Sequence, residues 1–453
     1  MDIHSKEHFF FIGVGGAGMS AIAQYLSGIG KKVSGSDRLF TNPENDYIKE
    51  QLEAEGIKCF VQDGSGITEE TQVIVASTAI EDTNVEIKKA NDLGIDRMVR
   101  SEILAAISKT KQTVALAGTS GKSTTTAILF HILYECGVSP SMMTGAGIVS
   151  LIEQGKIGNA FVGESDYLLI EADESDGSLV KYAPHIGVLL NMDKDHKEFD
   201  ELRVIFNTFK ANTRDHFIVN HSGGSVKEFS AGHSHDFGEG TDWDGKDYKQ
   251  EGFSISFKFK GIDVKMPTIG RHNMENALAC LVVADLIGVD LEKACAALAT
   301  YPGIYRRHQL LGEKNGVIVI DDYAHNPAKI AASIRAAQDV GKKVLAWFQP
   351  HGFTPTRFIR KELVEEVSAC LRPEDEMWMS EIYYAGGTTT KDISANDLIQ
   401  DLLAKGSKAR FVEDRDDLLE ALRPELDEGT VIVLMGARDP SLEKFGKDLF
   451  ENL

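Results

Sequence analysis

A glycine-rich segment near residue 120 has the residue types and spacing of a phosphate-binding loop. Residues 116–123 read LAGTSGKS, between an apolar, strand-like run (113–117) and a helical pattern (124–133). The full pattern GxxxxGK followed by Ser or Thr places glycine where this chain has Leu116, but the GKS end is intact. In such loops the backbone amides and the lysine hold the β- and γ-phosphates, and the serine hydroxyl ligates Mg²⁺. The pattern predicts an ATP site formed by Gly118, Thr119, Ser120, Gly121, Lys122, Ser123 and Thr124.

A second glycine-rich turn lies near the N-terminus, after the apolar run 8–12 and before a helical pattern. It matches GxGxxG, whose glycines allow a tight turn and a close approach of a diphosphate to the helix N-terminus. Asp37 follows at the distance typical of a ribose-binding acid. The ligand stays open, because dinucleotides and nucleotide-sugars both carry a diphosphate and a ligand-free turn would look the same. The candidate residues are Gly13, Gly15, Gly16, Ala17, Gly18 and Asp37.

Carboxylates follow another strand-like run, 167–170, in the segment EADESD (171–176). Ligands gather at the carboxyl ends of strands in open α/β sheets, and Mg²⁺ prefers oxygen ligands and substrate phosphates. The segment therefore indicates a metal site, with a solvated acidic loop as the alternative. His196 follows the next strand-like run, 188–191. A lone histidine is more often structural, but its position at a neighbouring strand end favours a ligand.

The presence of both glycine loops in one chain restricts the function. A dehydrogenase has no need of the phosphate loop at 116–123, and a simple nucleoside triphosphatase has no need of the N-terminal glycine turn at 13–18. The pair indicates an enzyme that consumes ATP to act on a nucleotide-linked substrate. An NAD-dependent oxidoreductase is the alternative from a different class, but it leaves GTSGKS, EADESD and the C-terminal third unexplained.

Parallel α/β units are the elements that would position these loops. The chain has 453 residues, and at roughly 150 residues per domain this length predicts about three domains. Strand and helix patterns alternate throughout, with a smaller antiparallel flap in 221–265. We expect three consecutive α/β domains: a Rossmann-like domain at 1–109, a P-loop-type ATPase domain at 110–303 and a Rossmann-like domain at 304–453.

Composition and charge exclude several classes of protein. The net charge is -21, which disfavours binding to nucleic acid or anionic membranes. The five cysteines are odd in number and form no CxxC pair, so we expect them to be reduced and packed as small apolar side chains. No signal-peptide pattern or membrane-length apolar run is present. We expect a cytoplasmic protein, and the sequence leaves its oligomeric state open.

Motifs along nearly the whole chain resemble those of the Mur ligases, the ATP-dependent enzymes that form amide bonds in peptidoglycan synthesis. The N-terminal segment FIGVGGAGMSAIA (11–23), with VSGSD (33–37), is most similar to members that join L-alanine to UDP-N-acetylmuramate. Ligases that recycle murein tripeptide share much of that pattern. The other matching motifs are AGTSGKSTTT (117–126), EADESD (171–176), NMDKDH (191–196), GRHNMEN (270–276), YPGIYRR (301–307) and DDYAHNP (321–327).

This resemblance implies roles for individual residues. The N-terminal glycine loop, with Ser36 and Asp37, would bind the UDP-sugar. Lys122 would bind the ATP phosphates, and Ser123, Glu171 and His196 would hold two Mg²⁺ ions. Lys122, His196 and His325 would be the catalytic residues. The remaining implied ATP contacts are Asn273, Asn276 and Arg306, and the implied amino-acid contacts are Asp322, His325, His351 and Arg357.

The implied reaction forms an amide in two steps. The substrate carboxylate attacks the γ-phosphate of ATP, giving an acyl phosphate, and the amine of an amino acid then displaces phosphate. The resemblance favours L-alanine as the acceptor. A murein tripeptide-recycling ligase, or another ligase with a different amino-acid or peptide acceptor, is the alternative. A catalytically inactive homologue is disfavoured because Lys122, Ser123, Glu171 and His196 are intact.

The sequence departs from the family pattern around the expected acceptor site. L-Alanine-adding members read PHRYTRTR where this chain has PHGFTPTR (350–357), so Gly352 and Pro355 replace two arginines. Asn326 stands where a second histidine is common, and Ser120 stands where histidine is usual in the phosphate loop. Arginine suits a carboxylate through two parallel hydrogen bonds. These departures lie around the expected acceptor site and not in the nucleotide motifs, and Arg357 is one remaining carboxylate partner.

Overall fold

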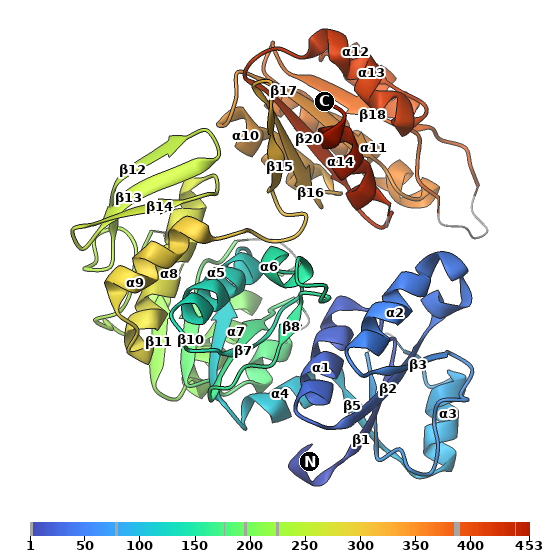
Figure 1. Ribbon diagram of the computed structural model, residues 1–453, viewed down its shortest axis with the longest axis vertical. Helices are drawn as coiled ribbons and strands as arrows, with labels where there is room; N and C mark the ends of the chain where they lie inside the picture. The colour runs from blue at the N-terminus through green and yellow to red at the C-terminus, as the bar shows by residue number, and fades with distance from the viewer. Residues whose placement is uncertain are drawn as a thin grey trace. The chain divides into compact units, whose positions relative to one another are not determined.

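The computed structural model describes residues 3–77, 80–175, 177–193, 197–222, 226–384, 390–439 and 441–453. The chain divides into two compact units (Figure 1). The first consists of Met1–Tyr248, Ser256–Pro267 and Arg271–Gly303, and the second of Lys249–Ile255, Thr268–Gly270 and Ile304–Leu453. Within the described ranges, none of the helices has the length and apolar character needed to span a membrane.

The N-terminal part of the first unit is a five-stranded parallel sheet of order β3-β2-β1-β4-β5. Every residue of the central strand β1 is buried, as expected for a strand with both faces covered. The strand order reverses at β1, and ligands of open α/β sheets bind at such a switch point. The elements are β1 (His8–Ile12), α1 (Ala17–Gly28), β2 (Lys32–Asp37), α2 (Asp46–Ala54), β3 (Lys58–Val61), β4 (Val73–Ala76), α3 (Val85–Asp92), β5 (Asp96–Val99) and α4 (Arg100–Ser108).

The second sheet of this unit has the order β11-β10-β6-β9-β7-β8 and is parallel except for the pairing of β8 with β7. Because β6 lies between β9 and β10, the loops that follow these three strands share one edge. Its elements are β6 (Gln112–Ala117), α5 (Lys122–Glu135), β7 (Ser141–Met143), α6 (Val149–Ile152), β8 (Ala160–Phe161), β9 (Tyr167–Ala172), β10 (Ile186–Leu189), α7 (Phe199–Asn212), β11 (His216–Val219), α8 (Arg271–Ile287) and α9 (Leu291–Ala297).

A small sheet of order β12-β13-β14 occupies the C-terminal part of the region predicted as a flap. Its strands are β12 (Gly245–Glu251), β13 (Ser254–Phe259) and β14 (Ile262–Met266). Strand β13 alternates buried and more exposed residues, the pattern of a sheet with one face covered.

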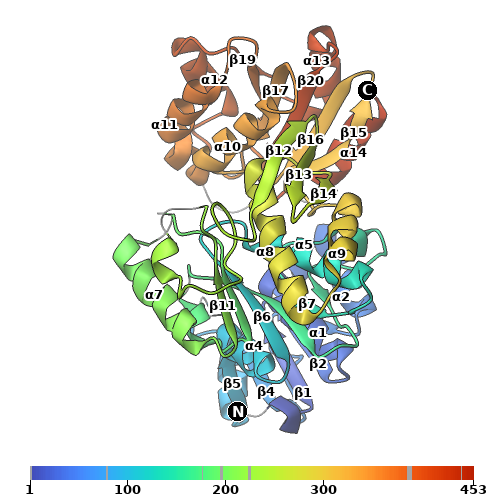
Figure 2. The same ribbon diagram turned by 90° about the vertical axis from the view of Figure 1, so that its left-hand side faces the viewer.

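The second unit contains a six-stranded sheet of order β15-β16-β20-β17-β18-β19, in which only β15 runs antiparallel to its neighbour. One face of the sheet packs against α10, α11 and α12, and the other packs against α13 and α14 (Figure 2). The elements are β15 (Gln309–Lys314), β16 (Val317–Asp322), α10 (Pro327–Gln338), β17 (Lys343–Gln349), α11 (Phe353–Cys370), β18 (Glu376–Met379), α12 (Ala395–Ala404), β19 (Ala409–Phe411), α13 (Leu418–Leu422), β20 (Thr430–Gly436) and α14 (Leu442–Glu451).

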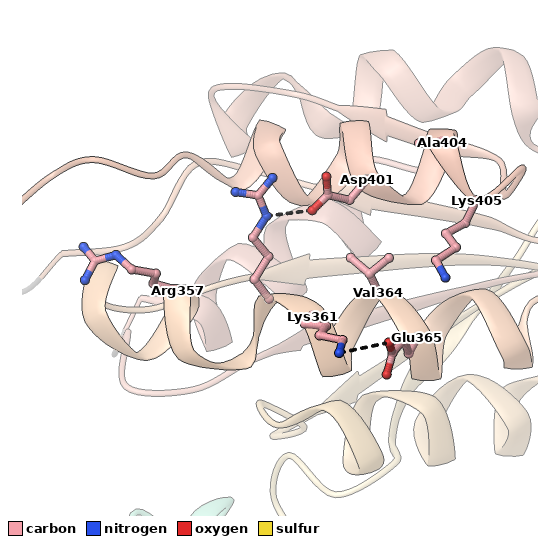
Figure 3. Close-up of a pocket in the computed structure, with 8 residues that line it drawn as sticks. Arg357, Lys361, Val364, Glu365, Asp401, Ala404 and Lys405 are labelled. Carbon is pink, nitrogen blue, oxygen red and sulfur yellow. Dashed lines mark hydrogen bonds and ion pairs between the residues drawn. The ribbon is translucent and has the colours of Figure 1, made fainter.

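An open groove of about 510 Å³ lies between α11 and α12 of the second unit (Figure 3). The Arg360 guanidinium in this groove donates to the Asp401 carboxylate at 2.6 Å. Of the predicted site residues that the structure describes, only Arg357 lines the groove. The lining residues are Arg357, Arg360, Lys361, Val364, Glu365, Asp401, Ala404 and Lys405.

The structure confirms the predicted α/β class, since each of the three predicted domains contains a largely parallel sheet. All five cysteines are free, and four of them are buried, as expected for small apolar side chains. The predicted boundary after residue 109 falls between α4 and β6, and the predicted boundary after residue 303 falls at the division between the two units. The exact domain limits stay a prediction.

Candidate active site

The predicted phosphate loop connects β6 to α5 and depends on two glycines with positive φ. Gly118 has φ of +143° and Gly121, at the N-cap of α5, has φ of +80°. A Cβ atom at 118 would lie 3.2 Å from the backbone of Asn191, and one at 121 would lie 3.0 Å from the side chain of Asn276. Glycine is therefore required at both positions for conformation and for space.

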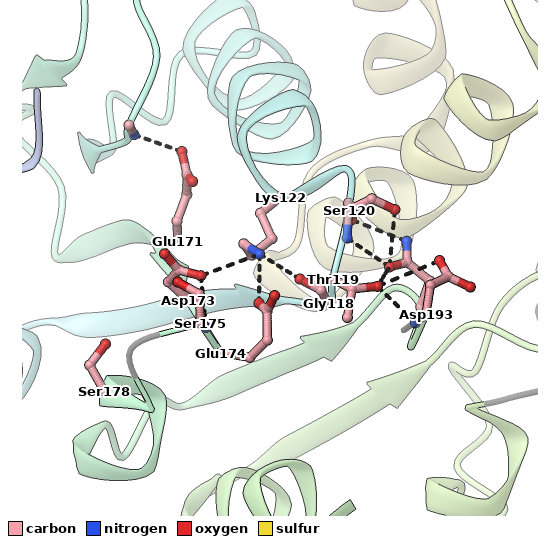
Figure 4. Close-up of polar contacts among 12 residues, drawn as sticks. Gly118, Thr119, Ser120, Lys122, Glu171, Asp173, Glu174, Ser175, Ser178 and Asp193 are labelled. Carbon is pink, nitrogen blue, oxygen red and sulfur yellow. Dashed lines mark hydrogen bonds and ion pairs between the residues drawn. The ribbon is translucent and has the colours of Figure 1, made fainter. Parts of the chain in front are cut away.

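The Lys122 ammonium is held over this loop by its neighbours (Figure 4). Its Nζ donates to the carbonyl of Gly118 at 2.7 Å and to Oε2 of Glu174 at 2.6 Å, and it lies 3.5 Å from Oδ1 of Asp173. Only 5% of the Glu174 side chain is exposed, so the lysine neutralises a buried carboxylate. A phosphate group that enters the loop would compete with Glu174 for the same ammonium.

Glu171 lies at the end of β9, next to the phosphate-loop strand. It pairs with Leu116 in the register, and its Oε1 accepts hydrogen bonds from the Gly145 amide at 2.8 Å and from the Thr144 hydroxyl. Ser123, the other predicted oxygen ligand of Mg²⁺, is a buried residue in the first turn of α5. Carboxylate and hydroxyl oxygens are the ligands that Mg²⁺ accepts alongside nucleotide phosphates, so this donor set fits the ion.

The complete predicted metal set was Ser123, Glu171 and His196, and His196 lies outside the described residues. Among the described residues, no group of three or more His, Cys, Asp and Glu side chains is arranged to hold a metal ion. The metal ligands therefore stay a prediction.

Asn191, which follows β10, fixes the conformation of the phosphate loop and was missed in the sequence. Its Oδ1 accepts from the Ser120 amide at 2.9 Å and from the Thr119 hydroxyl at 3.0 Å, while its Nδ2 donates to the Ser120 carbonyl at 3.1 Å. The motif NMDKDH begins with this residue, so its position directly after a strand was the available signal. Its partners are 71 and 72 residues away, and no local pattern identifies them.

Asn273 and Asn276, the two residues of GRHNMEN predicted to contact ATP, lie in the first turns of α8, and both are buried. Asn276 donates from Nδ2 to Oδ1 of Asn273 at 3.0 Å, and its own Oδ1 faces Gly121. The structure thus brings Asn276 to the phosphate loop, and Thr124 lies half-buried in the first turn of α5.

Arg306 lies in the second unit and is buried among structural partners. Its Nε donates to Oδ2 of Asp321 at 2.9 Å, and its Nη2 donates to the carbonyl of Gly436 at 3.0 Å. Burial raises the pKa of Asp321 to about 6, against the opposing effect of Arg306. The guanidinium stabilises the second unit, and its predicted contact with ATP stays a prediction.

The N-terminal glycine loop is tied to the end of β2. Gly13, with φ of +84°, donates its amide to the Ser36 carbonyl at 2.7 Å, and Gly15 donates to Oδ2 of Asp37 at 2.9 Å. The Ser36 hydroxyl is fully buried and donates to Glu86 at 2.6 Å, and burial raises the pKa of Glu86. Ser36 therefore holds the loop through its backbone carbonyl, while Asp37 binds the loop through its side chain.

The last three residues of GxGxxG form the N-terminus of α1, with Gly16 as its N-cap and Ala17 and Gly18 in its first turn. The carbonyl of Ala17 accepts a hydrogen bond from Nδ2 of Asn159 at 2.7 Å, which joins this helix to the second sheet of the same unit. Gly16 is exposed, and an added Cβ would meet only the Gly13 carbonyl, at 3.5 Å. A Cβ at Gly18 would lie 3.0 Å from the Arg100 guanidinium, so that position has little spare room.

Two of the predicted acceptor residues, His325 and His351, follow β16 and β17, the two strands that flank β20 in the sheet of the second unit. Their ring centroids are 5.9 Å apart. His325 places Nδ1 2.9 Å from the carbonyl of Tyr323, so Nδ1 carries the proton and Nε2 is the basic nitrogen of the neutral ring. Burial, followed by the charge of Arg438 and then that of His325, lowers the pKa of His351 to about 4.

Asp322, the third predicted acceptor residue, is occupied by local contacts. Its carboxylate accepts the amide of Ala324 at 2.8 Å and the amide of His308 at 3.2 Å. This carboxylate fixes the turn that carries His325. Its contribution is therefore to position the histidine, and a direct contact with the amino acid stays a prediction.

The residues that depart from the family pattern serve the starts of two helices. Gly352 is the N-cap of α11 with φ of +69°, and Pro355 lies in the first turn, where no amide donor is needed. Asn326 caps α10 by accepting the Lys329 amide at 2.9 Å. Arg357, the predicted carboxylate partner, forms an ion pair with Asp392. Ser120, described above, binds Asn191.

Comparisons with known proteins place this architecture in a family. Three family models match successive segments: the Mur ligase family catalytic domain at 8–112, the Mur ligase middle domain at 116–284 and the Mur ligase glutamate ligase domain at 306–438. A UDP-N-acetylmuramate–L-alanine ligase from Caldanaerobacter subterraneus subsp. tengcongensis is 33% identical over 96% of this chain and 96% of its own length. The chain belongs to the Mur ligase family. A relative with the same name from Geotalea daltonii is 33% identical over 99% of this Mur ligase and 98% of its own length.

Solved structures agree with this assignment. The crystal structure of UDP-N-acetylmuramate-alanine ligase MurC from Thermotoga maritima is similar, with a TM-score of 0.78, 25% identity and 98% coverage of both chains. A murein peptide ligase from Psychrobacter arcticus shares the fold, with a TM-score of 0.65, 21% identity and 98% coverage of both chains. The family and the three-domain α/β architecture predicted from the sequence are confirmed. As a Mur ligase, the protein is an ATP-dependent ligase that forms amide bonds.

Proposed function

We propose that this Mur ligase joins L-alanine to the carboxylate of UDP-N-acetylmuramate, with ATP cleaved to ADP and phosphate, in peptidoglycan synthesis. One observation carries the proposal: an intact phosphate loop, with Lys122 and Glu171 in place, occurs in a chain 33% identical over 96% of its length to a ligase named for that reaction. The alternative of an NAD-dependent oxidoreductase does not explain why this phosphate loop is present.

Lys122 is the residue that changes partner in the first step. Before ATP binds, its ammonium neutralises Glu174. When the β- and γ-phosphates enter the loop, they take over this ammonium, which then stabilises charge on the phosphoryl group as the substrate carboxylate attacks it. Bound Mg²⁺, held by Glu171 and Ser123, would neutralise phosphate charge. We propose a second ion at His196.

His325 is the residue that we place at the second step. Its Nδ1 is engaged by the Tyr323 carbonyl, which leaves Nε2 to accept a proton from the ammonium of the amino acid. The free amine then attacks the acyl phosphate and releases inorganic phosphate. His351, half-buried and with a lowered pKa, stays neutral near pH 7 and lines the same edge of the sheet.

The glycine loop after β1 is the proposed site for the UDP-sugar, because it lies at the switch point of its sheet with Asp37 beside it. We propose domain limits of 1–109, 110–303 and 304–453, which separate the three main sheets. A cytoplasmic location is also proposed, and the five free cysteines fit a reducing compartment.

A ligase that accepts a peptide or a different amino acid is the second candidate. The observation in its favour is the segment 350–357, where Gly352 and Pro355 serve the helix start and provide no cation for a carboxylate. The reaction would be the same, and only the amine donor would differ.

The test is phosphate release from ATP in the presence of Mg²⁺, UDP-N-acetylmuramate and a panel of amino acids and short peptides, with products identified by mass. We expect release that depends on both the UDP-sugar and L-alanine, with a product heavier by one alanine less water. A kcat/KM at least tenfold higher for another acceptor would select the second candidate. Release that requires no UDP-sugar would overturn the proposal.

A further inference from the structure

Three neighbouring strands of the second unit end at one edge and bring together side chains from different parts of the chain. In the register, Met435 of β20 pairs with Asp322 of β16 on one side and with Phe348 of β17 on the other. His325 follows the end of β16, His351 follows β17, and Arg438 follows β20. The carboxyl edge of a parallel sheet is where α/β enzymes bind ligands.

Arg438 has an unusual backbone conformation at this edge. Its φ is +65°, a left-handed value that residues with a Cβ atom rarely adopt and that glycine adopts freely. The following residue fixes the turn, because the buried Asp439 carboxylate pairs with Arg415 and accepts the Ser441 amide at 2.9 Å. Strained residues held by their surroundings occur at binding sites, where the strain places a side chain.

Arg438 also differs from nearby arginines in its charge environment. Arg306 pairs with Asp321, Arg357 with Asp392 and Arg415 with Asp439. Arg438 is exposed, and within the ranges that the structure describes it makes neither a hydrogen bond nor an ion pair. The positive charge of Arg438 helps to lower the pKa of His351, so the guanidinium is electrostatically coupled to that imidazole.

We infer that Arg438 binds the α-carboxylate of the incoming amino acid and so replaces the two arginines that Gly352 and Pro355 cannot supply. This inference rests on the proposed function, because it concerns the second substrate of that reaction. A guanidinium holds a carboxylate through two parallel hydrogen bonds and fixes its orientation. The amine of an amino acid anchored there would lie on the side of the two imidazoles, with Nε2 of His325 available to take its proton.

The experiment compares Arg438→Gly and Arg438→Lys with the parent enzyme. Glycine suits the left-handed backbone and removes the cation, so we expect an unchanged or higher Tm together with a KM for L-alanine raised at least tenfold. The KM values for ATP and UDP-N-acetylmuramate should stay within twofold. Arg438→Lys should recover part of the loss, because it restores the charge without the two-pronged geometry. Arg335→Ala, which removes an exposed arginine from α10 of the same unit, is the matched control and should leave all three KM values unchanged.

L-Alaninamide keeps the amine and lacks the carboxylate. It therefore distinguishes a loss of carboxylate recognition from a general loss of activity in the variant. The parent should prefer L-alanine over L-alaninamide at least tenfold in kcat/KM, and Arg438→Gly should reduce that ratio to near one. An unchanged ratio and KM for L-alanine in Arg438→Gly would overturn the inference, as would a selective rise in the KM for ATP. If the parent itself ligated no amino acid, the proposed function would fail as well, and the parent assay alone would reveal it.

Discussion

The phosphate loop of this Mur ligase largely keeps the family motif, whereas the acceptor edge departs from it. The acceptor edge is the edge of the second unit's sheet at which β16, β20 and β17 end. In the loop, Gly118, Gly121 and Lys122 match the family motif, and each has a partner that explains it. At the acceptor edge, Gly352, Pro355 and Asn326 depart from the motif and serve helix starts instead. The comparison teaches that the groups that handle ATP are constrained by chemistry common to the family, whereas the amine donor can be recognised by different residues.

Replacement of Lys122 should have the largest effect and tests the loop side of the comparison. We expect Lys122→Ala to lower kcat/KM by about 10³-fold or more, because charge on the transferring phosphoryl group loses its cation. The variant should also lose about 1–3 kcal/mol of stability, since Glu174 would keep a buried, unpaired carboxylate. Ligation kinetics and chemical denaturation measure the two losses.

The double variant Lys122→Ala/Glu174→Gln is the control for that stability loss. It removes the orphaned charge and should recover most of the stability, while activity stays low. Near-parental activity of either variant would show that the loop is not the ATP site. Full stability of the single variant would show that the ion pair with Glu174 contributes nothing.

Glu171 should give the next largest effect. We expect Glu171→Gln to lower turnover by about 10²-fold and to shift the Mg²⁺ titration to higher concentration, because a carboxylate ligand of a hard cation becomes a neutral amide. The Gly145 amide and Thr144 hydroxyl can still donate to the amide oxygen, so thermal unfolding should change little. A parental Mg²⁺ titration would contradict the role of Glu171 as a ligand.

The N-terminal glycine loop tests whether the two nucleotide loops have separate ligands. An added Cβ at Gly16 meets only the Gly13 carbonyl, at 3.5 Å, and the Gly16 backbone is extended, so Gly16→Val fits the fold. Its side chain would occupy the space of the diphosphate and should raise the KM for UDP-N-acetylmuramate about tenfold. The KM for ATP should stay constant, and a selective rise in that value would reverse the assignment of the loops.

The smallest expected effect concerns acid stability at the acceptor edge. Because His351 has a pKa of about 4 when folded and an ordinary value near 6.5 when unfolded, the unfolded chain binds the proton first as pH falls. The contribution of His351 to stability is therefore complete above about pH 6.5 and is lost between pH 6.5 and 4. His351→Asn should weaken the pH dependence of the unfolding free energy in this window. An identical pH profile would contradict a half-buried His351 that is neutral in the folded protein.

Sequence patterns over short stretches of the chain predicted the strand, loop and helix units whose residues are close together in the sequence. An apolar run followed by glycines and a helical period identified the strand, loop and helix at both nucleotide sites, and family motifs extended this to the third domain. The partners of those loops could not be read in the same way. Asn191 reaches Ser120 across 71 residues, and Glu174 reaches Lys122 across 52 residues.

Backbone conformation was the second source of missed information. An arginine at 438 gives no sequence signal of a positive φ, because arginine normally occupies right-handed or extended conformations. The same limit applied to Gly352, whose φ of +69° explains why glycine occupies an expected arginine position. Both φ angles are properties of the folded backbone and become visible only in the structure.

The central claim is that the carboxylate of UDP-N-acetylmuramate is activated by the γ-phosphate of ATP before an amine attacks it. It is tested most directly with UDP-N-acetylmuramate labelled with ¹⁸O in both carboxylate oxygens, in the presence of ATP, Mg²⁺ and L-alanine. Attack through an acyl phosphate leaves one labelled oxygen in the amide and transfers the other to inorganic phosphate. We predict one ¹⁸O in each phosphate released during ligation, measured by mass spectrometry. Unlabelled phosphate accompanying amide formation would contradict the account.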